Sequence, residues 1–360
     1  MQEPRAHDQP SRLPTGRPVG RVVLVGAVHE SVPVLEGLLT TTDAELVTVV
    51  TGTSAFAART AGAVDLAGRA ASEGIPVMRT DDINAPSVVD DIARLEPDLL
   101  VVAGWTRLLG DALLRVPRRG CVGFHASLLP RHRGRAPVNW AIILGEREAG
   151  NTMMLLDAGV DTGVIVDQEP IPIGPDDTCA TVYDAVGAAG ARMLLRHLPA
   201  LLAGQAPRVP QDPHAGDLLP KRTPEMGVLD WARSPHEVHD WVRALTRPYP
   251  GAFTSLDGER VWVWATRDPA RHQVDQPPGT VLDVDADSRG GFRVATEGGS
   301  VVVREVAGAE EEPSAAAGWA RARGLRPLET TFDPVPTDVS LWARGLGPRP
   351  TPAPVQAGVS

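Results

Sequence analysis

The chain has 360 residues, 42% of them hydrophobic, and carries a formal net charge of −10 at pH 7. This length suffices for two domains with ordinary cores, whereas the acidic balance disfavours a general nucleic-acid-binding protein, because neutralising phosphates requires a basic surface. Two cysteines are too few for a disulfide framework, and no apolar run reaches the roughly 18–20 residues of a membrane span, so a cytoplasmic protein is expected.

The first half of the chain alternates between buried apolar strands and helices. Strands are predicted at residues 21–26, 46–51, 75–77 and 99–103, and helical patterns separate them. Alternation of this kind predicts a doubly wound α/β fold with a parallel, Rossmann-like sheet. Residues 1–19 precede the first strand, lack the apolar core of a signal peptide, and are expected to form a disordered leader.

A histidine and an aspartate follow two further predicted strands. His125 comes directly after a short apolar run and precedes the turn at 127–130, where proline stops the strand. A second apolar run at 153–156 leads into a tight turn that contains Asp161. Strand ends are where α/β sheets place their chemistry, so the pair predicts a His/Asp site. Taken singly, His125 is more typical of a packed or capping residue, and Asp161 of an ordinary turn.

The order and spacing of these residues resemble the folate-dependent formyltransferases. Their shared pattern is Asn-x-His-x-Ser-Leu-Leu-Pro, then Arg-Gly, and later Asp-x-Gly. Here His125, the run Ser-Leu-Leu-Pro at 127–130, Arg-Gly at 133–134 and Asp161 match it in type and order. The version RGRAPVNW at 133–140 looks most like the formyltransferases of amino-sugar nucleotides. The resemblance implies formyl transfer from 10-formyltetrahydrofolate, as co-substrate, to a primary amine of a small molecule such as an amino-sugar nucleotide or a natural-product intermediate.

The resemblance also implies roles for individual residues. His125 would lie at the reacting centre, as hydrogen-bond donor to the oxyanion or as proton shuttle, and Asp161 would orient it. The residues expected to hold the folate are Trp105, Arg107, Leu108, Leu109, Asp157, Ala158 and Val160. The residues expected to contact the acceptor are Ser127, Leu128, Pro130, Arg133 and Arg135.

One catalytic position departs from the family pattern. Gly123 stands where the family has the Asn whose amide helps to hold the formyl oxygen as it becomes an oxyanion. Losing one such donor costs on the order of 100- to 1,000-fold in rate. A backbone N–H, Asn139 or a water substitutes for it, or the chemistry is altered, and the sequence leaves these open. A folate-binding homologue with altered or lost turnover is therefore one alternative.

The second half of the chain predicts a separate β domain. Short strands with glycine turns indicate a small β-barrel, and KRTPE at 221–225 and PYPGAF at 248–253 resemble the OB-like C-terminal domain of the methionyl-tRNA and aminoarabinose enzymes. The predicted organisation is a leader at 1–19, a catalytic domain at 20–204, a linker at 205–224, an OB-like domain at 225–332 and a flexible tail at 333–360.

Methionyl-tRNA formyltransferase is the other alternative. Where the tRNA enzymes carry a long basic loop, residues 51–60 offer only Arg59, so we expect a small-molecule acceptor and neither a nucleic-acid nor a membrane partner. No metal site is expected. His29, His125 and His132 form no ligand motif, and His236 and His239 are more typical of a packed or solvated helix face.

Overall fold

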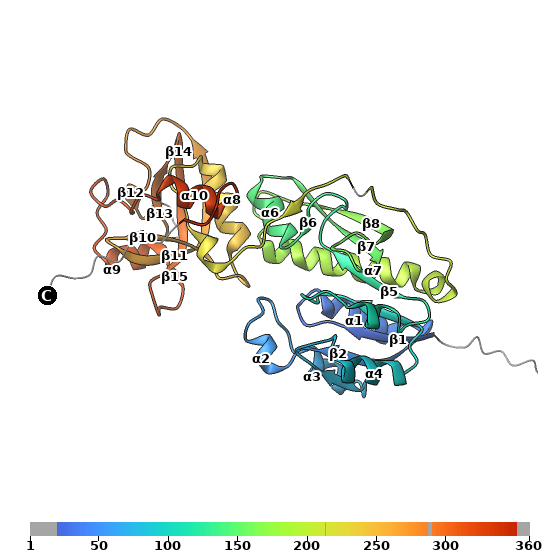
Figure 1. The fold of residues 1–360 in the computed structure, drawn as a ribbon. Coiled ribbons are helices and arrows are strands. Elements are labelled where there is room, and N and C mark those ends of the chain that lie inside the picture. Colours follow the sequence, from blue (N-terminus) through green and yellow to red (C-terminus); the bar gives the residue numbers. More distant parts are fainter. Residues whose placement is uncertain (1–19, 213, 287–289, 351–360) are drawn as a thin grey trace, which may run out of the picture.

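The computed structural model describes residues 20–212, 214–286 and 290–350, which form two domains with one main sheet each (Figure 1). The leader predicted at 1–19 lies outside the described residues, as does the part of the predicted tail at 351–360. Within the described ranges, no helix is both long enough and apolar enough to cross a membrane.

A seven-stranded mixed sheet forms the centre of the N-terminal domain. Its spatial order is β3 (Val77–Arg79), β2 (Ala44–Thr51), β1 (Gly20–Val25), β4 (Leu99–Val102), β5 (Cys121–His125), β7 (Glu148–Leu155) and β8 (Val164–Pro172). The strands from β3 to β5 are parallel, which confirms the predicted Rossmann-like sheet, whereas β7 and β8 run antiparallel to their neighbours.

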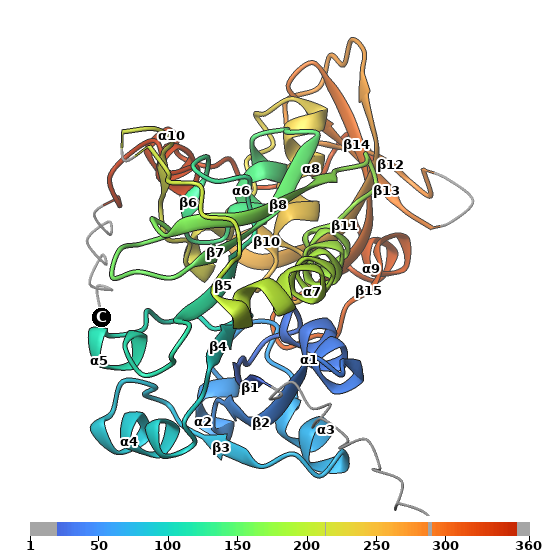
Figure 2. The ribbon, with the colours of Figure 1, turned by 90° about the vertical axis from the view of Figure 1, so that its right-hand side faces the viewer.

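Helices cover both faces of this sheet, as Figure 2 shows. One face packs against α1 (Ser31–Thr40), α3 (Leu66–Ser72) and the long α7 (Cys179–Ala203). The other face packs against α4 (Pro86–Arg94) and α5 (Asp111–Leu114). A short helix, α2 (Ser54–Ala57), follows β2. Helix α7 begins at a reciprocal Thr178–Thr181 capping box and ends at Gly204, whose φ of 73° suits a helix C-terminus.

The stretch predicted as a linker packs on the N-terminal domain. Its β9 (Leu218–Leu219) pairs in parallel with β6 (Arg133–Gly134), and Val209 forms an isolated bridge with Ile165. The strand and the bridge in this stretch therefore pack on the N-terminal domain rather than forming a free connector. Helix α6 (Pro137–Ile143) follows β6 and faces α8 of the second domain.

The C-terminal domain is built on an antiparallel sheet, as the sequence predicts. Its strands are β10 (Ala252–Leu256), β11 (Glu259–Arg271), β14 (Gly299–Ala307), β13 (Phe292–Thr296) and β12 (Val281–Val284), with β15 (Ser314–Ala315) beside β14. Its helical elements are the 3-10 turn η1 (Pro224–Gly227), α8 (Pro235–Leu245) and α9 (Ala316–Ala322). One apolar cluster runs from α6 and α7 into this domain, so the two domains share a core.

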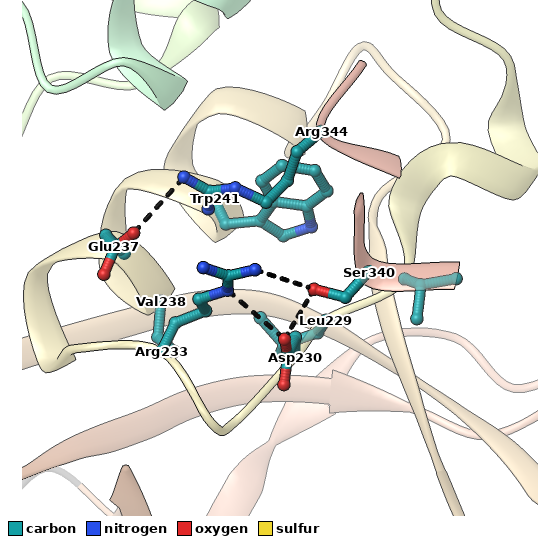
Figure 3. A pocket seen from close by; sticks show the side chains of 9 residues that line it. Leu229, Asp230, Arg233, Glu237, Val238, Trp241, Ser340 and Arg344 are labelled. Atoms are coloured by element: carbon teal, nitrogen blue, oxygen red, sulfur yellow. Dashed lines mark hydrogen bonds and ion pairs between the residues drawn. The ribbon is translucent and has the colours of Figure 1, made fainter. Parts of the chain in front are cut away.

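A helix, α10 (Thr337–Ala343), lies where the sequence predicts a flexible tail. Its Ser340 hydroxyl donates to Asp230 over 2.6 Å and accepts from Arg233 over 3.1 Å (Figure 3). The guanidinium of Arg344 pairs with Glu237 of α8 at 3.2 Å. These polar contacts hold the described end of the chain against the C-terminal domain and correct the tail prediction for residues 337–344.

Candidate active site

His125 is the last residue of β5, and its ring is buried. Its Nε2 lies 2.7 Å from the main-chain oxygen of His132. A carbonyl oxygen only accepts, so Nε2 carries the proton in this contact. The other ring nitrogen, Nδ1, lies 3.5 Å from Oδ1 of Asp161. Charge-assisted N–H···O bonds are about 2.7–2.9 Å long, so this pair is close but not tightly bonded.

Asp161 has an unusual backbone conformation and is held by hydrogen bonds from Gly134 and Gln211. Its φ of 55° is left-handed, a conformation that Asp tolerates better than most residues. Its Oδ2 accepts a hydrogen bond from the backbone N–H of Gly134 over 2.8 Å. The amide of Gln211 donates to the carbonyls of Asp161 and Gly163, over 2.9 and 2.8 Å. Gln211 lies in the stretch predicted as a linker, and only the fold brings it to the site.

The sequence predicts that His125 and Asp161 meet at neighbouring strand ends, but the structure brings them together in another way. Strand β7 runs antiparallel to β5, with His125 opposite Thr152 and Val122 opposite Leu155. The carboxyl ends of β5 and β7 therefore point in opposite directions. His125 and Asp161 meet because the loop after β5 returns to the turn after β7, where Gly134 bonds Asp161.

The turn after His125 is held by its own side chains. The hydroxyl of Ser127 donates to the carbonyl of Arg131 over 2.7 Å, and Thr152 of β7 donates to the carbonyl of Ser127 over 2.6 Å. Thr152 also accepts from the backbone of Leu129 over 3.0 Å. The buried Ser127 hydroxyl is thus used within the turn, while Leu128 and Pro130 are half-buried beside it.

The two arginines predicted to grip the acceptor differ. Arg133 is buried, and its guanidinium donates to Gln211 over 2.8 Å and to the carbonyls of Ala215 and Asp212 over 3.0 and 3.2 Å. It therefore binds the returning segment rather than an open site. Arg135 is exposed and forms no ion pair with any residue the structure describes, so its charge is available.

Gly123 has ordinary strand geometry, paired with Val102 and Met154. The half-buried Leu156 packs over it, so no side-chain amide stands here. Asn139 is an unsuitable substitute, because its amide is buried and donates to the carbonyl of Ala244 over 2.6 Å. The nearby thiol of Cys121 is no alternative nucleophile, since burial raises its pKa to about 12.

The segment predicted to line the pterin is shaped by residues outside it. Trp105 stacks on Phe56 with ring centroids 5.0 Å apart, and its buried indole N–H has no acceptor among the described residues. Arg107 lies over the same Phe56 ring at 5.5 Å. Asn84 donates to the carbonyl of Leu108 over 3.0 Å and accepts from Gly110 over 2.7 Å, which clamps the segment.

The remaining predicted folate residues leave apolar surface open. Leu108 is 58% exposed and Val160 42% exposed, whereas Leu109 is buried in the core. Asp157 shapes its own turn by accepting from Gly159 and Thr162, over 3.0 and 2.7 Å, and Ala158 is exposed. Two loops thus present exposed apolar side chains beside main-chain polar groups, a combination that suits a flat heteroaromatic ring.

Sequence reasoning missed several residues that build this site, namely Asn84, His132, Glu146, Gln211 and Asp217. Asp217 accepts from the backbone N–H of His132 over 3.1 Å. Gln211 and Asp217 lie in a stretch whose proline and glycine content indicates a linker. Asn84 precedes a helix in the way of an ordinary capping residue. In the part of the chain that the structure describes, no three His, Cys, Asp or Glu side chains gather as they would around a metal ion.

The sequence is similar to known protein families and to individual relatives. Residues 22–198 match the family described as formyl transferase, and residues 221–324 match the formyl transferase C-terminal domain. The methionyl-tRNA formyltransferase of Geobacter sulfurreducens is 40% identical over 232 residues, which cover 64% of this chain and 71% of that protein. The corresponding protein of Desulforamulus reducens is 36% identical, with coverage of 64% and 72%.

Solved structures share the fold. HypX from Aquifex aeolicus in complex with tetrahydrofolic acid has a TM-score of 0.59 at 18% identity, covering 88% of this chain and 49% of that one. An N-formyltransferase from Helicobacter canadensis, in complex with folinic acid and dTDP-3-aminofucose, has a TM-score of 0.58 at 15% identity, covering 79% and 98%. With both domains matched and relatives this similar over most of their length, the chain belongs to the formyltransferase family.

Proposed function

We propose that this protein transfers a formyl group from 10-formyltetrahydrofolate to a primary amine at the site formed by His125 and Asp161. The observation that carries the proposal is the buried contact between the imidazole Nδ1 and the Asp161 carboxylate at 3.5 Å. This contact lies within the family's matched region. A carboxylate beside an imidazole supplies the proton transfers that amine formylation needs.

The chemistry assigns separate tasks to the two ring nitrogens. The acceptor attacks the formyl carbon as a neutral amine, because an ammonium has no lone pair. A new C–N bond forms, the bond from the formyl carbon to the folate nitrogen breaks, and the proton lost by the amine passes to that leaving nitrogen. Nε2 of His125 is occupied by the His132 carbonyl. Proton transfer therefore falls to Nδ1 and Asp161, which face each other.

The donor site that we propose lies between residues 105–109 and 157–160. The unpartnered indole N–H of Trp105 fits a ring acceptor of the pterin, and exposed Leu108 and Val160 offer apolar contact to its faces. Folates in the HypX and Helicobacter structures support this class of donor. When bound, the folate supplies the formyl group, and this chain's own residues orient it and move the proton.

Methionyl-tRNA is the first candidate acceptor, because the similar curated proteins carry that name. One feature of the C-terminal domain favours it independently. The exposed guanidinium of Arg260 lies 4.1 Å from the ring centroid of Phe253 and 5.4 Å from that of Trp262. Arginine and aromatic side chains gathered on one face are typical of surfaces that contact unpaired nucleotides.

A small anionic amine, such as an amino-sugar nucleotide, is the second candidate. Where the tRNA enzymes carry a long basic loop, the short segment after β2 has Arg59 as its one cation, and Arg59 pairs with Asp81 at 3.2 Å. Arg135 remains exposed near the catalytic pair and can bind a phosphate. The Helicobacter enzyme, with its bound sugar nucleotide, supports this class.

A direct transfer assay distinguishes between the two candidate acceptors. Purified full-length protein and 10-formyltetrahydrofolate are incubated with initiator methionyl-tRNA or with a panel of amino-sugar nucleotides, and formylated product is quantified by mass spectrometry. We expect product with methionyl-tRNA, and none from a His125→Ala variant that still folds. Product with the sugar nucleotides alone would favour the second candidate. Absence of product with every amine would contradict the proposed function.

A further inference from the structure

We propose that Glu146 and His132 are positioning residues that fix the orientation of the catalytic imidazole. The inference deepens the proposed function and rests on it, because it concerns the same His125. It starts from the 2.7 Å contact between Nε2 of His125 and the carbonyl of His132. Whatever aims that carbonyl also decides which ring nitrogen is left to face Asp161.

The carbonyl of His132 is aimed by an unusual backbone conformation. His132 has a φ of 57°, in the left-handed region that residues other than glycine adopt only at an energetic cost. Such conformations persist only where surrounding contacts enforce them, and they concentrate at functional sites. A relaxed backbone at His132 would swing its carbonyl away from His125.

Two contacts of His132 enforce this conformation. The backbone N–H of His132 donates to Oδ1 of Asp217 over 3.1 Å. Its ring Nε2 lies 3.2 Å from Oε1 of Glu146, and the ring is buried. The same Oε1 accepts from Arg131 over 3.1 Å. Glu146 therefore anchors two consecutive residues of the loop.

Glu146 is itself fixed by the end of α6. Gly145 has a φ of 71°, and the backbone N–H groups of Gly145 and Glu146 donate to the carbonyls of Ile142 and Ala141 over 2.9 Å each. This pair of bonds is the Schellman arrangement that ends a helix at a left-handed glycine. The chain of support thus runs from helix α6 through Glu146 and His132 to the imidazole of His125.

The expected consequence is a selective loss of turnover. In Glu146→Ala, we expect the His132 carbonyl to lose its orientation, so that the Nε2–H of His125 loses its acceptor. The turnover number should fall about 10- to 100-fold, since misplacing a catalytic group by roughly 1 Å costs about 100-fold. The KM for the folate donor should stay within about threefold, because that site lies on other loops.

A readout that does not depend on turnover tests the same point. Ring-nitrogen NMR shifts of full-length protein report which nitrogen of His125 is protonated, with a His125→Ala sample to identify the signal. We expect mainly the Nε2–H form in the wild type, and a mixture of both forms in Glu146→Ala. His132→Asn should shift the populations in the same direction, because Asn tolerates the left-handed backbone but cannot reach Glu146.

Glu148→Ala is the matched control, since Glu148 is an exposed neighbour on β7 with no ion pair among the described residues. If Glu146→Ala fails to fold, Glu146→Gln removes the charge at constant size, and the same direction of change is expected. Unchanged tautomer populations in the folded Glu146 and His132 variants would overturn the proposal, as would an equal effect of Glu148→Ala. A wild type that transfers no formyl group would remove the proposed function but leave the NMR test of positioning intact.

Discussion

Leu156 occupies the space into which a side chain at position 123 would extend. A Cβ atom on Gly123 would lie 2.7 Å from Cδ2 and 3.1 Å from Cγ of Leu156. Leu156 also packs against the buried core on that side of the sheet. Glycine therefore fits this position because it has no side chain that would meet Leu156. It is not needed for an unusual backbone conformation, because its φ is not in the left-handed region. An apolar contact has replaced the amide that the family pattern leads one to expect.

Gly123→Asn alone should therefore lower stability without raising turnover. Forcing extra atoms into a packed site typically costs about 1–3 kcal/mol, because neighbours leave their preferred rotamers. Thermal unfolding and the turnover number measure the two effects. Combined with Leu156→Ala, the Asn gains room, and turnover should rise by up to roughly 100-fold if its amide reaches the oxyanion.

Leu156→Ala by itself is the control for that pair, and it should not increase the rate. A clear gain in turnover by Gly123→Asn alone would show that Leu156 moves aside freely. It would then follow that the missing amide, and not the packing, limits the wild-type site.

Asp161→Asn should remove most activity while preserving the fold. Asn tolerates the left-handed φ of 55°, and its amide oxygen can still accept from Gly134. What disappears is the negative charge that faces Nδ1 of His125. We expect the turnover number to fall about 100- to 10,000-fold, in line with the loss of a general acid–base partner.

Circular dichroism and folate binding by calorimetry should remain close to wild type in this variant. Asp91→Asn is a suitable control for removal of a carboxylate, because Asp91 is half-buried on helix α4 and pairs there with Arg94. If Asp161→Asn retained wild-type turnover, proton transfer would have to use a group other than this carboxylate.

A dense motif singled out His125 and Asp161, which the fold brings to within 3.5 Å of each other, and their catalytic roles stay predictions. Sequence patterns were sufficient for the parallel part of the sheet, because strand–helix alternation is a local signal. They were insufficient for the direction of β7, since a short run buried on both faces carries no mark of orientation. Helix α10 escaped prediction because prolines flank it, and Pro336 stands at its N-cap. Its stability comes from the contacts of Ser340 with Asp230 and Arg233, which no local pattern records.

The supporting residues of the site were missed for a related reason. Gln211 and Asp217 act through long-range bonds to Asp161 and His132, across a segment whose composition indicates a connector. The position of Arg133 in the loop after the turn at 127–130 predicts a contact with an anionic acceptor. The fold instead turns its guanidinium toward Gln211, Asp212 and Ala215.

The two cysteines should make stability fall at alkaline pH. Burial raises the pKa of Cys121 and of Cys179 from 9.0 to about 12. Between these values the folded state keeps thiol protons that the unfolded state has lost. The stabilisation is therefore complete below pH 9 and is lost as the pH rises through about 12. The free energy of unfolding, measured in urea from pH 8 to 11, should fall more steeply than in a Cys121→Ala/Cys179→Ala variant.

Alkylation gives an independent check on these thiols. At pH 8 neither should react with iodoacetamide in the folded protein, because the thiolate is the nucleophile and burial suppresses it. Both should react after denaturation. Rapid alkylation of the native protein, or parallel pH profiles for the wild type and the double variant, would contradict the burial argument.

Arg222 should hold the two domains together. Its guanidinium lies 4.9 Å from the ring centroid of Trp140 on α6 and 4.8 Å from that of Trp241 on α8. It donates to the carbonyls of Met226 and Ala343 over 2.7 and 3.1 Å. Burial lowers the pKa of Arg222 to about 10, because the guanidinium is desolvated. Aromatic faces and carbonyls stabilise this cation, and no carboxylate of the described residues forms an ion pair with it.

Arg222→Ala should therefore uncouple the domains. A desolvated cation–π contact is worth about 2 kcal/mol or more, and this guanidinium makes two, one to each domain. We expect calorimetry to resolve two unfolding transitions in the variant where the wild type shows one. Arg222→Lys should restore little, because an ammonium lacks the planar group that stacks between both rings.

Arg349→Ala, which removes an exposed arginine 5.8 Å from the Trp342 ring, should leave the single transition in place. A single, unshifted transition in Arg222→Ala would mean that the shared apolar core alone couples the domains.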